Sequence, residues 1–250
     1  MSAWVVAYAL LLARVAAFVT VGPWRYAAPS RLVRVGMAVG LSFAWLGHAE
    51  TRAEQLAYVE PTVLALVLLS VQEVLIGAAA GYVAYLFLLP AQFAGDLVGR
   101  QMGLSLGQLA DPATRSPTAL LAQVFQLLAL AVYFGLNVHH AWLLLLDDVI
   151  RRWPTGAAVL FNVAPAVTGM QRAYASGVSM VGPLVLVGFS LLLIVSLLNK
   201  AAAGFNYFSV GLGFQIFGGL VALLVFVPSV CHALRWIAYD WLRWAHAVFR

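Results

Sequence analysis

The chain has 250 residues, of which 64% are hydrophobic and only 9% are charged, and its mean hydropathy is +0.95. A soluble globular domain usually carries about 25% charged residues, so this chain has too few polar side chains to cover a surface that faces water. The composition therefore excludes a disordered chain and a soluble enzyme and indicates a membrane protein. The net charge of +5 suits an anionic membrane surface better than a nucleic acid, and the single cysteine excludes an internal disulfide.

Six apolar stretches predict an all-α membrane protein, because a helix satisfies its own backbone hydrogen bonds in hydrocarbon. They are residues 4–21, 32–47, 61–89, 118–146, 178–198 and 208–230. The second stretch is short for a span. The third and fourth have 29 residues each, about 43 Å of helix against a hydrocarbon core of about 30 Å. We expect some of these helices to bend or to project from the bilayer, with a bend at Gly135–His140 in the fourth.

Two charged residues lie inside apolar stretches, Arg14 in the first and Glu73 in the third. A charge within a membrane is costly and usually faces a partner, a cavity or water. The simpler interpretation is an ion pair or polar contact between two helices. The alternative is a proton, ion or small-molecule site, which would make the chain a secondary transporter that uses Glu73 and Arg14.

Small residues recur at a helical spacing of four in two places, and such spacing lets another backbone approach closely. We predict that these glycines pack helices together. They are Gly77, Gly81, Gly95, Gly99, Gly103 and Gly107.

Catalytic motifs are missing from the sequence. There is no phosphate-binding loop, no His-Glu-x-x-His and no Gly-x-Ser-x-Gly. The adjacent His139 and His140 point about 100° apart on a helix and cannot share one metal ion. A membrane enzyme that uses either histidine with Asp147 or Asp148 stays as a third alternative. We expect no cofactor.

Two further segments carry distinctive residue types. In residues 111–117 two prolines and an Asp before Pro predict a short stiff loop between helices. In residues 231–250 tryptophan and tyrosine alternate with arginine, which predicts an amphipathic C-terminal helix at the membrane interface.

The run AGDLVGRQMGLSLGQLADP at residues 94–112 resembles the signature of the FliR family of flagellar export-gate proteins, whose injectisome relatives are called SctT. The resemblance covers about residues 10–220. It continues in Arg14, Pro23, Pro29 and Arg34, in EVLIG at residues 73–77, in His139-His140 and Pro154, and in NYFSVG at residues 206–211. The sequence departs from the family pattern at Val138, at Ala203-Gly204 and at Leu212-Gly213.

The resemblance implies a single export-gate domain over residues 1–250 that is not an enzyme. It implies assembly with FliP-like and FliQ-like membrane subunits, and with an FlhB-like subunit, in the bacterial inner membrane at the flagellar basal body. Unfolded flagellar proteins would pass through the channel so formed, and membrane lipids would surround it.

By the same resemblance, the loop of residues 103–117 would plug the closed pore. The residues assigned to this gate are Leu104, Ser105, Leu106, Asp111, Pro112, Arg115 and Pro117.

Overall fold

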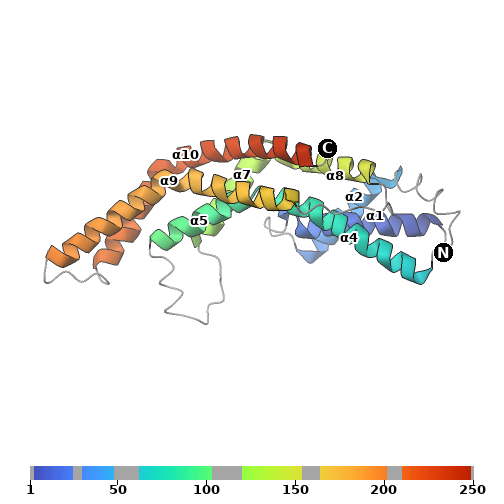
Figure 1. Ribbon diagram of the computed structural model, residues 1–250, viewed down its shortest axis with the longest axis horizontal. Helices are drawn as coiled ribbons and strands as arrows, with labels where there is room; N and C mark the ends of the chain where they lie inside the picture. The colour runs from blue at the N-terminus through green and yellow to red at the C-terminus, as the bar shows by residue number, and fades with distance from the viewer. Residues whose placement is uncertain are drawn as a thin grey trace. The chain divides into compact units, whose positions relative to one another are not determined.

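The computed structural model describes residues 3–24, 30–47, 62–102, 120–153, 164–201 and 210–248. Within these ranges the regular elements are helices and no strand occurs, which confirms the predicted all-α fold. The helices, labelled as in Figure 1, are α1 (Ala3–Val21), α2 (Arg31–Ala44), α4 (Val63–Tyr85), α5 (Leu89–Gln101), α7 (Leu120–Gly135), α8 (Val138–Arg152), α9 (Ala164–Ala201) and α10 (Leu212–Val248).

Local sequence signals explain where several helices begin. The Ser30 hydroxyl oxygen accepts a hydrogen bond from the backbone N–H of Val33 at 3.4 Å, and Thr62 caps α4 in the same way through Ala65. These bonds satisfy N–H groups that have no partner inside the helix. Pro90 lies in the first turn of α5, where its missing N–H costs nothing.

The fourth apolar stretch is broken into two helices at the predicted place. Helix α7 ends at Gly135 and α8 begins at Val138. Between them Asn137 adopts a left-handed backbone with φ of 55°, a conformation that Asn tolerates better than most residues. The bend expected from Gly135-Leu136-Asn137 is confirmed.

Four helices in the described part of the chain are long and apolar enough to cross a bilayer, namely α1, α4, α9 and α10. Helices α7 and α8 together would make a fifth span, broken in the middle. Helix α2 has only 14 residues and is not among them, in line with the short second apolar stretch. The described part of each of the six predicted apolar stretches is helical apart from Trp45, Thr62 and the turns at residues 86–88 and 136–137.

The two longest helices are α9 and α10, with 38 and 37 residues, and each contains an interior proline, Pro183 and Pro228. The described part of residues 231–250, predicted to be an amphipathic helix, is the last part of α10.

Contacts between the helices gather in two compact units. The first unit comprises Met1–Phe87, Asn137–Gly169 and Trp241–Arg250, and the second comprises Leu88–Leu136 and Met170–Asp240. In the first unit α1 packs against both α2 and α4, and α8 also contacts α4; in the second unit α5 packs against α7.

The core of the first unit is built around α1. Ala7, Leu11, Val15 and Phe18 recur every three or four residues on this helix and are fully or almost fully buried. That spacing places the four side chains on one face of α1, and α1 buries this face against its neighbours.

Candidate functional site: close helix crossings and a buried ion pair

The crossing of α1 and α4 in the first unit is closer than any side chain would permit. A Cβ atom added at Gly77 would lie 2.0 Å from the carbonyl oxygen of Arg14, and one added at Gly81 would lie 2.7 Å from the carbonyl oxygen of Phe18. Glycine is therefore required at both positions of α4 for the two backbones to meet.

The same crossing holds a buried ion pair. The guanidinium Nε of Arg14 donates to Oε2 of Glu73 at 2.6 Å, and both side chains are 0% exposed. Arg14 also donates through Nη1 to the backbone carbonyl of Trp153, 2.5 Å away at the end of α8. One arginine thus joins three helices of the first unit, which is the helix-to-helix contact that the sequence favoured over an ion site.

A second polar contact in the first unit involves Asp147 on α8. One carboxylate oxygen accepts a hydrogen bond from the indole Nε1 of Trp45 at 2.8 Å, and the other pairs with Arg151 at 2.7 Å. The carboxylate is therefore engaged by an indole and a guanidinium. In the described ranges no three His, Cys, Asp or Glu residues lie close enough to hold a metal ion.

In the second unit, α5 lies against α7 by a similar glycine contact. A Cβ atom at Gly95 would come within 2.5 Å of the carbonyl oxygen of Leu121 and within 2.6 Å of the Cα of Ala122. Gly99, one helical turn further along α5, is also buried. At Gly95 the backbone of α5 contacts the backbone at the start of α7.

Helix α5 also meets α9 in the second unit. A Cβ atom at Gly177 would lie 2.8 Å from the carbonyl oxygen of Pro90, and the rings of Phe93 and Tyr174 meet edge to face with centroids 4.9 Å apart. Further along, Gly188 leaves room for the side-chain amide of Gln101. The small residues of α9 thus leave the space that residues of α5 occupy.

The end of α5 is held by α10. The side-chain amide of Gln215, only 3% exposed, donates a hydrogen bond to the backbone carbonyl of Gln101, and the Met102 side chain fills the space beside Gly219. Carbonyls in the last turn of a helix lack partners inside it, so the Gln215 amide supplies a donor to a part-buried carbonyl at the end of α5.

Sequence reasoning missed Gln215 and Trp45. The available signal for Gln215 was a lone amide within the apolar stretch 208–230, where a polar side chain needs a partner. For Trp45, the only signal was an indole N–H close to the end of a short helix.

The remaining predicted site residues lie outside the described residues. They are Gly103, Gly107, Leu104, Ser105, Leu106, Asp111, Pro112, Arg115 and Pro117. Their assigned roles in packing and gating stay predictions. What the structure does describe is the helix that leads into this segment, α5. Its last residue, Gln101, contacts α9 and α10, and the next residue, Met102, contacts α10.

Near the C-terminus the predicted aromatic cluster divides into buried and exposed members. Trp241 is buried and its ring lies 4.4 Å from that of Trp244, which in turn packs against Gly169. Trp236 and Tyr239 are exposed, as residues at a membrane interface would be.

Together these features define an all-helical membrane protein whose helices are joined by backbone contacts at glycine and by a buried ion pair. The chain belongs to the bacterial export proteins, family 1, whose family model matches residues 5–238.

Curated relatives point the same way. The chain is 30% identical to the flagellar biosynthetic protein FliR of Escherichia coli (strain K12) over 165 residues, or 65% of this chain and 63% of that relative. It is 28% identical to FliR of Aquifex aeolicus (strain VF5) over 201 residues, or 79% of this chain and 76% of the relative. FliR of Buchnera aphidicola subsp. Acyrthosiphon pisum is 26% identical over 175 residues, or 69% and 68%. These matches confirm the FliR resemblance of residues 94–112 and their flanks.

Proposed function

We propose that this chain is a subunit of the flagellar type III export channel in the bacterial inner membrane. It would assemble there with FliP-like and FliQ-like subunits, and with an FlhB-like subunit, and unfolded flagellar proteins would cross through the assembled channel. The observation that carries the proposal is the family match over residues 5–238, together with relatives that are named flagellar biosynthetic proteins.

The lengths of α9 and α10 support assembly with other proteins. At about 1.5 Å per residue, the 38 residues of α9 make a helix about 57 Å long, nearly twice the hydrocarbon core of about 30 Å. To fit within that core as a straight rod, α9 would need a tilt of about 58°, beyond the range of about 0–40° seen for membrane helices. We therefore expect part of the helix to leave the hydrocarbon.

Both helices leave large apolar side chains uncovered by the described part of the chain. Where the helices extend beyond lipid, such surface needs protein to cover it. Among the most exposed are Leu186, Phe217, Leu224 and Val225. Partner subunits stacked along α9 and α10 would supply that cover.

Within this proposal the buried glycines Gly77, Gly81, Gly95 and Gly99 keep the helices in the arrangement that the partner subunits bind. The loop of residues 103–117 would close the channel at rest, as its resemblance to the family signature implies. Helix α5 supports this assignment because α7, α9 and α10 all contact it, which gives the loop a fixed starting point.

A transporter site at Arg14 and Glu73 is not favoured. The two side chains are fully buried and bonded to each other, so neither is exposed to a passing ion or small molecule.

Affinity purification of the tagged full chain in mild detergent, followed by mass spectrometry, tests the proposal. We expect a large complex that contains two other small hydrophobic proteins of the FliP and FliQ types. Recovery of a monomer or homodimer alone would overturn it, because one such chain cannot enclose a pore for a polypeptide. The same tag on an unrelated multispanning protein serves as the control for nonspecific binding of hydrophobic proteins.

Two matched variants extend the experiment to the packing assignment. Gly95→Ala places a methyl group against the α7 backbone, whereas Gly182→Ala on α9 meets nothing within 4 Å. We expect Gly95→Ala to lower recovery of the partners and Gly182→Ala to leave it unchanged. Equal recovery from both would show that the α5–α7 contact is not needed for assembly.

A further inference from the structure

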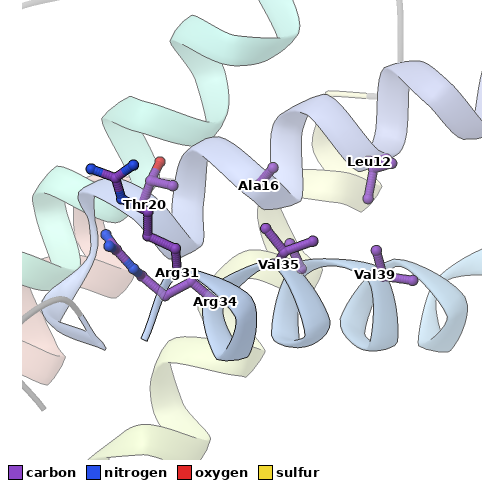
Figure 2. Close-up of a pocket in the computed structure, with 8 residues that line it drawn as sticks. Leu12, Ala16, Thr20, Arg31, Arg34, Val35 and Val39 are labelled. Carbon is purple, nitrogen blue, oxygen red and sulfur yellow. The ribbon is translucent and has the colours of Figure 1, made fainter. Parts of the chain in front are cut away.

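A groove of about 410 Å³ runs between α1 and α2 in the first unit, where the two helices lie antiparallel. Figure 2 shows that its two ends differ: Thr20, Arg31 and Arg34 gather at one end, and Leu12 and Val39 lie at the other. The groove is thus polar and cationic at one end and apolar along the rest, because its remaining wall residues are Ala16, Val35 and Ala38.

The two arginines at the cationic end have no anionic partner in the part of the chain that the structure describes. The Nε atom of Arg34 is buried and makes no hydrogen bond there, and the ion pairs seen in the first unit use other arginines, Arg14 with Glu73 and Arg151 with Asp147. A buried guanidinium N–H without an acceptor is unfavourable. An anion at this end of the groove would accept that hydrogen bond and would balance the positive charges of the two arginines.

The position of this end along α1 indicates where the anion would come from. Residues Trp4–Val21 of α1 form a candidate membrane span, and Thr20 lies one residue before its end. With α1 spanning the bilayer, the guanidinium groups beside Thr20 lie at the depth of lipid headgroups, and the apolar walls of the groove run from there toward the acyl chains.

We infer that the groove binds an anionic phospholipid. The phosphate accepts hydrogen bonds from Arg31 and Arg34, and one acyl chain lies along Ala16 and Val35 toward Leu12 and Val39. A planar guanidinium suits this role because it offers several donors to phosphate oxygens in a fixed geometry.

The cationic end and the apolar path of the groove suit an anionic lipid. From Arg31 to Val39 the groove follows nine residues of α2, a rise of about 12 Å. An extended acyl chain can lie along this path between the apolar side chains of α1 and α2. This inference does not depend on the proposed export role.

Photo-cross-linking of the full chain tests the inference. The residue p-benzoylphenylalanine replaces Val39 on the groove wall in one variant and, in the control, Leu224, which is exposed on α10. Each chain is reconstituted into vesicles of equal parts phosphatidylglycerol and phosphatidylcholine and irradiated, and intact mass identifies the adduct. The same two chains are also irradiated in bacterial membranes to detect protein adducts.

The expected result is an excess of phosphatidylglycerol adducts at position 39 and equal adducts at position 224. In the Val39 background, R31Q/R34Q should reduce the excess about tenfold, since each arginine near an anionic headgroup contributes to binding. R31K/R34K keeps the charge and should keep most of the excess, which separates charge from misfolding. Equal lipid adducts at position 39, no adduct there, or a polypeptide adduct in membranes would each overturn the inference.

Discussion

The two units of the molecule use the same close contact at glycine but secure it by different means. In the first unit the α1–α4 crossing at Gly77 is joined to a fully buried ion pair between Arg14 and Glu73. In the second unit the α5–α7 crossing at Gly95 carries no such pair among the described residues, and α5 is held at its end by the neutral amide of Gln215.

The two kinds of contact differ in how strictly they fix the position of one helix against another. A buried ion pair fixes it strictly, because any shift of register leaves a charge unpaired in a low-dielectric interior. When helices joined by a glycine contact or a neutral amide shift against each other, the free-energy cost is smaller. We therefore expect substitutions at the ion pair to have the largest effects, and those at neutral contacts to have smaller ones.

The largest effect is expected from Glu73→Ala, which leaves the Arg14 charge buried without its carboxylate. Breaking a buried pair in this way costs about 3–5 kcal/mol. Thermal unfolding of the purified chain in detergent measures the loss. The double variant Arg14→Met/Glu73→Met removes both charges and should recover most of the stability; if it is as unstable as Glu73→Ala, the penalty does not come from an orphaned charge.

Next in size is Gly77→Ala. The added methyl group would lie 2.0 Å from the Arg14 carbonyl oxygen, so α1 and α4 must move apart. We expect a loss of about 3 kcal/mol, the upper end of the usual cost of overpacking. Gly40→Ala on α2 is the matched control, because nothing lies within 4 Å of its Cβ position.

The control should behave in the opposite direction, since Ala in an open helix is favoured over Gly by about 1 kcal/mol. Equal destabilisation by Gly77→Ala and Gly40→Ala, measured by the same thermal unfolding, would mean that backbone contact is not the reason for glycine at position 77.

In the second unit, Gln215→Leu should leave the part-buried Gln101 carbonyl without this donor, at a cost of about 2 kcal/mol. The expected effect is local, so hydrogen exchange of the last turn of α5 is the sensitive measurement. Gln123→Leu on the exposed face of α7 serves as the control. Unchanged exchange at residues 98–102 in Gln215→Leu would show that α10 does not hold this end of α5.

The smallest effect is expected from Trp45→Phe, which removes the indole donor to Asp147 while Arg151 still pairs with that carboxylate. One part-buried hydrogen bond contributes about 1 kcal/mol. Trp236→Phe, at an exposed ring, should change the unfolding temperature less. A loss comparable to that of Glu73→Ala would contradict the ranking of charged over neutral contacts.

Much of the fold follows from local patterns in the sequence. Apolar stretches of sufficient length predict helices because hydrocarbon leaves the backbone no other partner, and Gly135-Leu136-Asn137 interrupts one of them for a steric reason. The two intramembrane charges indicate a pair because each is too costly alone. These inferences need only the chemistry of neighbouring residues.

The contacts that the sequence did not predict depend on helices that are distant along the chain. The glycine spacing on α4 does not say that the Arg14 carbonyl fills the space beside Gly77. The carbonyl of Trp153 as a second acceptor for Arg14, and that of Gln101 as the acceptor for Gln215, are backbone groups that any residue carries, so no side-chain type marks them in advance.

The position of Arg14 has a consequence for how the chain is inserted during synthesis. An arginine at the centre of a nascent span costs about 2.5–3.5 kcal/mol at the translocon, and its carboxylate partner is encoded 59 residues later. At about 5–20 residues per second, α1 waits roughly 3–12 seconds before Glu73 is even made. Pairing with Glu73 removes that cost, so we expect the first span to be held less firmly until α4 has followed it into the membrane.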